Sequence, residues 1–308
     1  MRTTLHRALA ITLALLVLPA AAADAPGRLI DGPAGKLFVD ARGNATGRPL
    51  LIVNGGPGFD HGYLLSSPVW DELAKTRRVV MYDQRGTGRS TPVKPETSLT
   101  LADQLADIEA VRKSLGVEDI DLLGHSYGGA LVMAYTARYP QRVKKLLIVD
   151  SAAPKWKDTI FLFSQVFPDV NERVDSFEFA AQFGDRASIE GGLREYLSMI
   201  FWDPDHRDAV LRQVSLKGFS RHVNEALDAD MGRYDLNPEI AKFRMPVLVI
   251  TGRYDMNVAP LTAWRIAHAI PEAQIVFFEQ SGHLPAYEEP DKYLKVLEAF
   301  LSTKKSQP

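Results

Sequence analysis

Ser126 stands between two glycines in GHSYG, the only Gly-x-Ser-x-Gly pattern of the chain. An apolar run ends directly before this pattern and a helical pattern starts directly after it, so we expect the serine at a sharp strand-to-helix turn. Such a turn leaves no room for side chains at Gly124 and Gly128, and it brings the hydroxyl near the positive end of the helix. The pattern therefore predicts a nucleophilic serine. The alternative is a Gly–Ser turn that merely opens an ordinary helix.

A serine hydroxyl is a weak nucleophile until a neighbouring base removes its proton. Among the seven histidines, His283 follows the apolar run QIVFFE, which puts it at the sheet edge that also carries Ser126. Asp255 follows the run VLVITG at the same edge and can orient the imidazole. The order serine, aspartate, histidine along the chain is the order that α/β-hydrolases use. We therefore predict these three residues as the catalytic group.

The remaining histidines have simpler interpretations. His61 in the glycine loop either lines the site or packs, and the side chain of His125 should point away from the nucleophile. Three others lie on helical patterns and are expected at the surface or at helix caps: His206, His222 and His268.

The segment NGGPG follows the apolar run LLIV and gives unusual backbone freedom to the end of an expected strand. A phosphate cradle would need several N–H donors, usually a lysine, and a helix that starts at once. Pro57 has no N–H, the next lysine is Lys75, and we expect no helix before Ser67. A nucleophilic serine instead needs two backbone N–H groups aimed at the oxyanion. Gly56 and Tyr127, the residue after the serine, are predicted to supply them.

The elements that position these residues alternate between strand-like and helix-like runs from Lys36 onward. Short, almost continuously apolar runs suit strands that are buried on both faces of a parallel sheet. We expect strands at 51–54, 78–83, 120–124, 144–150, 246–252 and 274–279, and helices at 100–115, 127–139, 260–269 and 291–301. Ser98 and Gly116 should bound the first helix. The alternation predicts an α/β fold with a mostly parallel central sheet flanked by helices.

The alternation breaks between Ala152 and Pro238, where helical patterns rich in Phe, Trp, Asp and Arg replace the strands. We interpret this stretch as a helical lid inserted over the edge where open α/β folds bind ligands, with a separate small domain as the alternative. The predicted organisation is a signal peptide at 1–23, a first core part at 24–151, a helical lid at 152–240 and a second core part at 241–308.

A basic start, an apolar run from Ala8 to Leu18 and an Ala-x-Ala site before Asp24 predict a secretory signal peptide. The run is shorter than the roughly 20 residues of a spanning helix, so we expect cleavage after Ala23 and a periplasmic or secreted protein without stable membrane association. The 308 residues include no cysteine, which excludes cysteine nucleophiles, cysteine-held metals and disulfides. A net charge of −2 offers no basic field for nucleic acid.

Five motifs together resemble the proline iminopeptidase group of α/β-hydrolases, which includes tricorn-interacting aminopeptidases: NGGPGFDHGYL, MYDQRGTGRS, GHSYGGAL, GRYD and SGHLPAYEEP. The resemblance spans roughly residues 36–150 and 245–300. It implies an α/β-hydrolase fold with a Ser126–His283–Asp255 triad and an oxyanion hole at Gly56 and Tyr127. It also implies that the enzyme needs neither a metal nor a cofactor.

The resemblance further implies that Asp83 and Arg85 support the scaffold rather than the chemistry. Two features depart from the family pattern. The glycine loop begins with Asn54 where the family usually has His, and we expect Asn54 to brace the loop by hydrogen bonds. The acidic lid motif that holds a substrate amine in the family has no match in residues 152–238. The candidates for substrate binding there, each otherwise a solvated helix-face residue, are Glu178, Glu190, Glu195 and Glu225.

The expected function is that of an exported serine hydrolase that acts on a small molecule or short peptide through an acyl-enzyme. Within this class, an aminopeptidase of the proline iminopeptidase type is favoured over a carboxylic-ester hydrolase or lactonase. A catalytically silent hydrolase fold used for ligand binding, and non-hydrolytic chemistry such as carbon–carbon cleavage, are the alternatives from other classes.

Overall fold

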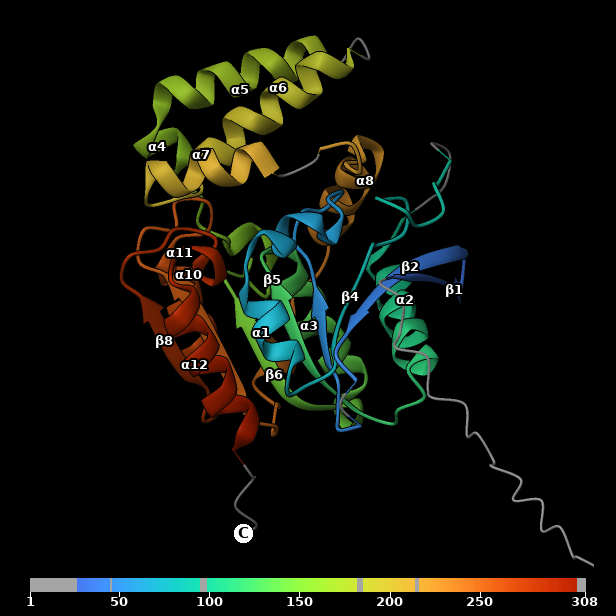
Figure 1. The fold of residues 1–308 in the computed structure, drawn as a ribbon. Coiled ribbons are helices and arrows are strands. Elements are labelled where there is room, and N and C mark those ends of the chain that lie inside the picture. The colour runs from blue at the N-terminus through green and yellow to red at the C-terminus, as the bar shows by residue number, and fades with distance from the viewer. Residues whose placement is uncertain (1–26, 45, 95–98, 182–184, 214–215, 304–308) are drawn as a thin grey trace, which may run out of the picture.

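The computed structural model describes residues 27–44, 46–94, 99–181, 185–213 and 216–303. The predicted signal peptide at 1–23 lies outside these ranges. Within them, an eight-stranded sheet runs in the order β1-β2-β4-β3-β5-β6-β7-β8 and forms the centre of the molecule (Figure 1). No helix in the same ranges is both long enough and apolar enough to span a membrane.

The strands from β4 across to β8 pair in parallel, whereas β2 is antiparallel to both β1 and β4. Their bounds are β1 Arg28–Gly32, β2 Gly35–Arg42, β3 Leu50–Val53, β4 Val79–Tyr82, β5 Ile120–His125, β6 Val143–Val149, β7 Val247–Gly252 and β8 Gln274–Phe278. All six predicted strands are present. The β1–β2 hairpin was missed, because β1 is a largely exposed edge strand with charged residues and lacks a continuous apolar run.

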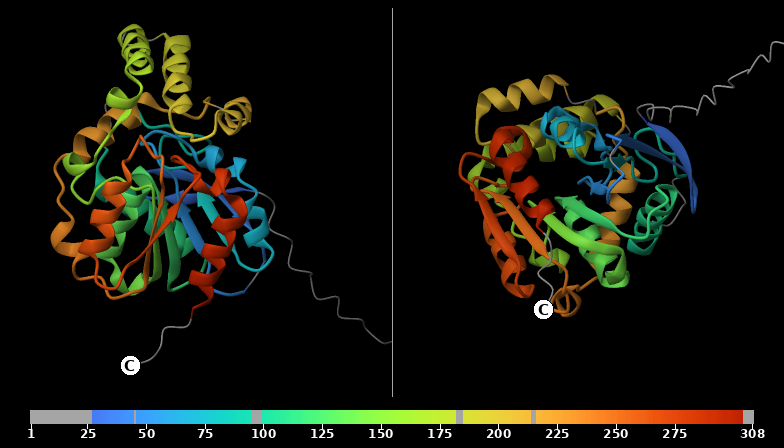
Figure 2. Two further views of the ribbon diagram at one scale, coloured as in Figure 1. Left: turned by 90° about the vertical axis from the view of Figure 1, so that its left-hand side faces the viewer. Right: turned by 60° about the horizontal axis from the view of Figure 1, so that its bottom comes forward.

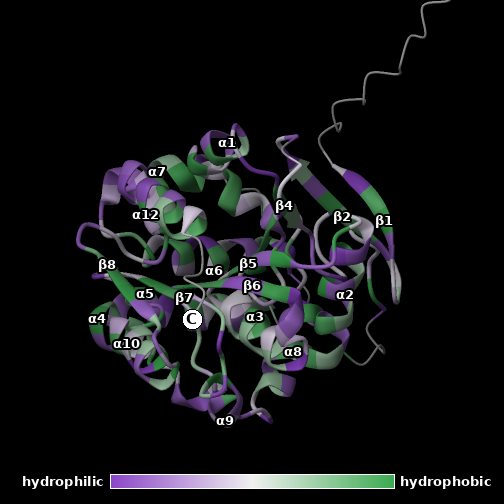
Figure 3. Ribbon diagram, turned by 90° about the horizontal axis from the view of Figure 1, so that it is seen from below, coloured by the Kyte–Doolittle hydropathy of each residue, from purple (hydrophilic) through white to green (hydrophobic). Residues whose placement is uncertain are grey.

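The parallel strands are apolar on both faces because helices cover both faces of the sheet. Leu122 of β5 belongs to a core cluster with helices α2 and α3, and its neighbour Leu123 belongs to the opposite cluster with α1 and α12. Figure 3 shows hydrophobic stretches along the strands, while the surrounding helices alternate between hydrophilic and hydrophobic residues. Burial on two faces is therefore the physical origin of the continuous apolar runs.

The predicted core helices are all present as α2 (Leu101–Ser114), α3 (Tyr127–Arg138), α10 (Pro260–Ala269) and α12 (Pro290–Ser302). The start of α2 differs from the prediction: Thr100 is its N-cap and forms a capping box with Asp103, and Ser98 lies outside the described residues. The glycine loop also becomes helical earlier than expected, since the 3₁₀ helix η1 (His61–Ser66) precedes α1 (Val69–Ala74).

Between β6 and β7 the chain is helical, as expected. The elements are η3 Trp156–Asp158, α4 Phe163–Val166, α5 Pro168–Ala181, α6 Arg186–Ser198, α7 Pro204–Gln213, α8 Arg221–Met231 and α9 Asn237–Ile240. Helices α4 to α7 stand above the sheet, as Figure 1 and the left view of Figure 2 show. By contrast, Val223 of α8 and Ile240 of α9 pack into the main core. Within residues 152–240, helices α4 to α7 therefore lie above the sheet (Figure 1), whereas α8 and α9 contribute side chains to the main core.

Candidate active site

Ser126 occupies a strained turn between β5 and α3, with φ 56° and ψ −124°. Its N–H donates to the carbonyl of Val149 at 2.9 Å, which ties the turn to the end of the neighbouring strand β6. A Cβ added at Gly124 would lie 2.2 Å from the carbonyl oxygen of Gly128, and one at Gly128 would lie 2.2 Å from that of Val53. Close approach of the backbone therefore requires glycine at both positions, as the Gly-x-Ser-x-Gly pattern predicted.

His283 and Asp255 meet at the carboxyl edge of the sheet. His283 Nδ1 lies 2.7 Å from Asp255 Oδ2, and the backbone N–H groups of Asn257 and Val258 both donate to Asp255 Oδ1 at 2.9 Å. Asp255 is completely buried, so these contacts fix its carboxylate without help from solvent. His283 lines one cavity together with Ser126. The structure therefore brings the three predicted catalytic residues to one place.

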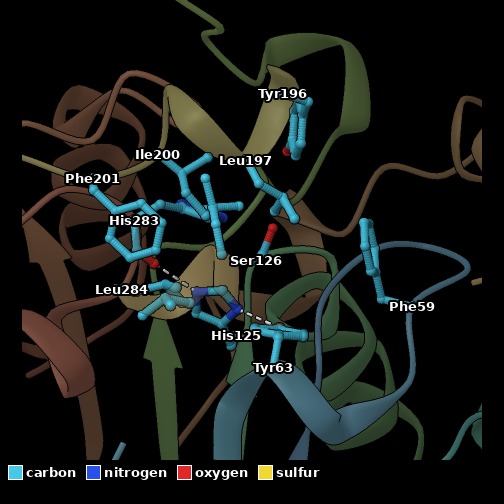
Figure 4. A pocket seen from close by; sticks show the side chains of 13 residues that line it. Phe59, Tyr63, His125, Ser126, Tyr196, Leu197, Ile200, Phe201, His283 and Leu284 are labelled. Carbon is cyan, nitrogen blue, oxygen red and sulfur yellow. Dashed lines mark hydrogen bonds between the residues drawn. The ribbon is translucent and has the colours of Figure 1, made fainter. Parts of the chain in front are cut away.

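His283 Nε2, the nitrogen that faces away from Asp255, lies 3.0 Å from Asn257 Nδ2. Among the hydrogen bonds of the described residues, none joins this nitrogen to the Ser126 hydroxyl. Figure 4 shows that hydroxyl directed into the cavity, towards Leu197 and Tyr196. Sequence reasoning missed Asn257, for which the only signal was its position two residues after Asp255.

Asp150 at the end of β6 approaches the same group. The ligand atoms of Asp150, Asp255 and His283 lie within 4.8 Å of one another, which makes them the cluster in the described residues that could geometrically hold a metal ion. Burial, and next the charge of Asp255, raise the pKa of Asp150 well above its ordinary value. Both oxygens of Asp255 already have protein partners, and Asp150 Oδ1 accepts from the N–H of Gly252 at 2.9 Å.

The glycine loop borders the cavity from the side of β3. Gly56 has a φ of 131°, lines the cavity with Ser126 and precedes Pro57 through a cis peptide bond. A Cβ on Gly55 would lie 2.8 Å from the Ser126 Cβ, so this glycine too permits the close approach of loop and serine. Tyr127 begins α3 with its side chain buried in the core, so only its backbone is available to the site.

Asn54 braces the loop in the way that we expected. Its side-chain Nδ2 donates to the backbone carbonyls of Gly55 at 2.9 Å and Phe59 at 2.8 Å. Its backbone carbonyl accepts from Gln84 Nε2 at 2.8 Å. Asn54 is completely buried, and its side chain spans the bend of the loop from the inside. An amide at this position therefore holds the loop that carries Gly56.

His125 is not directed away from the site, contrary to the prediction. It lines the cavity with Ser126 and its ring packs against that of His283 at a centroid distance of 4.7 Å. Its Nε2 donates to the backbone carbonyl of His283 at 2.8 Å, and its Nδ1 accepts from the hydroxyl of Tyr63 at 2.7 Å (Figure 4). Tyr63 in turn accepts from the N–H of Gly55 at 2.7 Å. Burial, and then the charge of His283, lower the pKa of His125 to about 3, so its ring stays neutral.

His61 packs in the scaffold and does not line the cavity. Its Nδ1 lies 2.5 Å from Asp83 Oδ1 and its Nε2 lies 3.6 Å from Asp40 Oδ2. Burial favours the neutral ring, but the hydrogen bonds and charges of Asp40 and Asp83 outweigh it and raise the pKa of His61 to about 9. Arg85 forms a buried pair with Asp107 at 2.6 Å. These contacts agree with the scaffold role expected of Asp83 and Arg85.

The cavity above Ser126 is mainly apolar. It is lined by Gly56, Phe59, Tyr63, His125, Ser126, Tyr196, Leu197, Ile200, Phe201, Val210, Leu211, His283 and Leu284. Helices α6 and α7 and the segment between them supply its roof. None of these described lining residues carries a carboxylate.

The four candidate glutamates therefore lie outside the cavity that contains Ser126. Glu190 pairs with Arg186 at 2.9 Å and Glu195 pairs with Arg173, both on the surface of the helices. Glu178 and Glu225 instead line a second cavity, which shares three residues with the first: Gly56, Phe59 and Tyr196. Two of the four are thus neighbours of the site, although Glu225 is paired with Arg221 at 2.6 Å.

Glu288 links the His283 loop to the segment that follows α6. Its Oε1 accepts from the N–H groups of Trp202 and Asp203 at 2.8 and 3.2 Å, and its Oε2 accepts from that of Gly282 at 2.7 Å. Burial raises its pKa to about 7. Sequence reasoning did not single out Glu288, because two of its three partners, Trp202 and Asp203, are distant in the chain.

The fold and the site geometry together define an α/β-hydrolase, and comparisons with known proteins agree. A family profile for the alpha/beta hydrolase fold matches residues 48–193. Solved structures with similar folds include an esterase from Thermogutta terrifontis (TM-score 0.70, 23% identity, 90% of this chain and 98% of that one) and an enol-lactonase from Burkholderia xenovorans (TM-score 0.69, 21% identity, 90% and 100%).

Similarity in sequence narrows the class further. The chain is 30% identical to the proline iminopeptidase of Saccharolobus solfataricus over 84% of its own length and 86% of that protein. It is also 30% identical to the proline iminopeptidase of Clostridium botulinum, over 87% and 94%. The chain therefore belongs to the proline iminopeptidase family of α/β-hydrolases.

Proposed function

We propose that this protein is an exported serine hydrolase in which Ser126 is the nucleophile, His283 the general base and Asp255 the residue that orients it. The observation that carries the proposal is the 2.7 Å contact between His283 and Asp255 beside a cavity that also contains Ser126. The positive φ of Ser126 supports it, because backbone strain in a non-glycine residue persists where the surrounding structure enforces it.

The reaction proceeds through an acyl-enzyme. Ser126 Oγ attacks the acyl carbon while its proton passes to His283 Nε2, and the carbonyl electron pair moves onto oxygen. The N–H groups of Gly56 and Tyr127 stabilise this oxyanion, each with an effect of about 10²–10³ in rate. His283 then gives the proton to the leaving group, whose bond to carbon breaks. Water repeats the sequence and releases the acid.

The substrate that best fits the relatives is a short peptide with a small apolar N-terminal residue such as proline. Two relatives that are 30% identical to this chain are named proline iminopeptidases. An aminopeptidase needs an acceptor for the free amino group, and Glu178 and Glu225 supply carboxylates in the cavity that adjoins the site at Gly56. Glu178 is the better candidate of the two, since Glu225 is paired with Arg221.

A carboxylic-ester hydrolase or lactonase is the second candidate function, and a specific observation favours it. The described residues that line the cavity around Ser126 present mainly apolar side chains and no carboxylate. Such a lining suits an uncharged acyl group, since desolvating an ammonium ion without a partner is costly.

A substrate panel distinguishes the two. We expect the mature enzyme to hydrolyse prolyl and alanyl arylamides, with kcat/KM reduced about 10- to 100-fold when the amine is acetylated. Glu178→Gln should reproduce much of that loss for the free amine and leave the acetylated substrate unaffected. Glu172→Gln, on the exposed surface of the same helix, is the matched control. Turnover of short acyl esters or lactones without turnover of arylamides would assign the ester function instead.

Export is the remaining part of the proposal. The predicted signal peptide implies that the mature chain begins at Asp24. Expression of the full chain followed by fractionation should yield a periplasmic or secreted protein with this N-terminus by mass spectrometry. An intact N-terminus on a cytoplasmic protein would contradict it.

A further inference from the structure

The base nitrogen of the proposed triad is already occupied. Because the carboxylate of Asp255 can only accept, His283 Nδ1 carries the proton of that hydrogen bond, and Nε2 of the neutral ring is an acceptor. Asn257 Nδ2 therefore donates to Nε2, at 3.0 Å. A proton transferred from Ser126 must arrive at this same lone pair, so the amide and the serine hydroxyl compete for it.

The amide is held firmly in this position. Asn257 is 4% exposed and lies in the loop between β7 and α10, where its own N–H donates to Asp255 Oδ1 at 2.9 Å. One residue thus contacts both partners of the Asp255–His283 pair, through its backbone and through its side chain. This arrangement fixes the tautomer in which Nδ1 carries the proton and Nε2 accepts from the Asn257 amide.

Asn257 also connects the base to the roof of the cavity. Its side chain interacts with the hydroxyl of Tyr196, on helix α6, and Tyr196 lines the cavity above Ser126 (Figure 4). A substrate that fills the cavity up to Tyr196 therefore reaches a residue whose hydroxyl interacts with the amide of Asn257.

We propose that Asn257 is a positioning residue that holds His283 Nε2 as an acceptor in the empty site and yields it to Ser126 when substrate displaces Tyr196. This inference rests on the proposed triad. Once Nε2 is protonated, the N–H of Asn257 would face another N–H, so the amide must turn away or present its oxygen. The charged imidazole is consequently disfavoured while Asn257 keeps its present orientation.

Other groups around His283 act on the same equilibrium. The carboxylate of Asp255 favours the charged ring, and Asp150 lies close behind it. His125 packs against the ring but stays neutral and donates only to the backbone carbonyl of His283. Tyr196 interacts with the side chain of Asn257, and Glu288 accepts from the N–H of Gly282, next to His283, at 2.7 Å. Because none of these groups changes in an Asn257 variant, a shift in pH dependence reports the amide itself.

The test is the rate of labelling by a fluorophosphonate probe as a function of pH. In this reaction the Ser126 Oγ–P bond forms, fluoride leaves, and the serine proton passes to His283. The two main variants are Asn257→Ala and the larger Asn257→Leu. Tyr196→Phe is a milder change, because it removes the hydroxyl but keeps the ring. Asn237→Ala, on the exposed start of α9, is the control. Thermal unfolding checks that each variant is folded.

We expect the acid limb of the rate profile to move to higher pH by about 0.4–1 pH unit in both Asn257 variants, the effect of losing one ordinary hydrogen bond. The plateau rate should rise about 2- to 10-fold, because Ser126 no longer competes with the amide. Tyr196→Phe should give a smaller shift in the same direction, and it decides the matter if neither Asn257 variant folds. The control should match the wild type.

Two results would overturn the inference while leaving the triad intact. The first is that the labelling rate of the Asn257 variants falls at low pH over the same pH range as that of the wild type. The other is a plateau rate that falls more than tenfold with an unmoved limb, which would give Asn257 a purely structural role. A wild type that does not label at any pH would instead remove the proposed function, and this inference with it.

Discussion

The site has a floor and a roof, and different forces hold each of them. The loops after β3, β5, β7 and β8 form the floor, whereas α6, α7 and the segment between them form the roof. In the floor, buried polar groups contact the backbone of neighbouring loops: Asp255 accepts two N–H groups and His125 donates to the carbonyl of His283. In the roof, apolar side chains such as Leu197 and Phe201 face the cavity, and the charged pairs lie on the outer surface.

These two kinds of contact suit two different roles: the chemical reaction in the floor and substrate recognition in the roof. Buried hydrogen bonds with fixed partners hold the reacting groups in one geometry, which acid–base catalysis requires. Apolar contacts between helices are less directional and accept changes of side chain at moderate cost. We therefore expect floor substitutions to abolish turnover and roof substitutions to change which substrates are used.

The largest effect should follow from Ser126→Ala. Loss of the nucleophile should reduce kcat by about 10⁴-fold or more, with an unchanged melting temperature. Ser176→Ala, on the exposed surface of α5, is the matched control and should be fully active. Steady-state kinetics on the best substrate of the panel measures both, and substantial activity in Ser126→Ala would assign the nucleophile elsewhere.

Asp255→Asn should have the next largest effect, with kcat reduced about 10³- to 10⁴-fold. An amide in place of the carboxylate can donate to His283 Nδ1, which favours the tautomer that cannot accept the serine proton. Asp235→Asn, on the surface before α9, serves as the control. A loss of less than tenfold would show that another group, such as Asp150, orients the imidazole.

Roof substitutions should act on specificity. Leu197→Ala and Phe201→Ala should each change kcat/KM by about 10- to 100-fold for some substrates and not for others. Labelling by a small fluorophosphonate should change by less than threefold, because the floor remains intact. An equal loss for every substrate and for the probe would show that the roof also positions the reacting groups.

The sequence predicted the floor far better than the roof, and the reason is physical. Continuous apolar runs follow from burial on both faces of the sheet, so the strand ends that carry Ser126, Asp255 and His283 could be located one by one. Gly124 and Gly128 pointed to the turn because close backbone approach excludes other residues there.

What the sequence did not reveal are contacts between segments that lie far apart in the chain. Tyr63 meets His125 across 62 residues and Glu288 meets Trp202 across 86, and no local pattern encodes either pairing. The edge hairpin β1–β2 escaped because half-exposed strands lack a continuous apolar run. The lid glutamates could not be ranked, since solvated and functional carboxylates on a helix face look alike in sequence.

Two buried histidines of the floor and scaffold should make stability depend on pH with opposite signs. The pKa of His125 is lowered to about 3, so its contribution is present above pH 6.5 and is lost as the pH falls towards 3. The pKa of His61 is raised to about 9, so its contribution is complete below pH 6.5 and is lost as the pH rises through 9. Each slope should be about 1.4 kcal/mol per pH unit.

Urea unfolding of the wild type, His125→Asn and His61→Asn at pH 5.5, 7 and 8.5 separates the two. The gap in the free energy of unfolding between wild type and variant should shrink at low pH for His125 and at high pH for His61. Parallel pH dependence in all three proteins would contradict these assignments.

The smallest effect should come from the charged pairs on the outer surface of the roof. Arg186→Ala and Glu190→Gln should change the free energy of unfolding by less than about 0.5 kcal/mol, since both partners are solvated. Salt up to 0.5 M should abolish even this difference. A loss above about 2 kcal/mol would mean that electrostatics holds the roof after all.

Mapping of a covalent adduct examines the proposed activation of Ser126 by His283 and Asp255. After incubation with a fluorophosphonate, mass spectrometry of the digested protein should find one adduct per chain, on the peptide that contains Ser126. The adduct should vanish in Ser126→Ala, persist in Ser176→Ala and form at least about 10²-fold more slowly in Asp255→Asn. No adduct on folded wild-type protein, or an adduct on a different residue, would rule out Ser126 as the activated nucleophile.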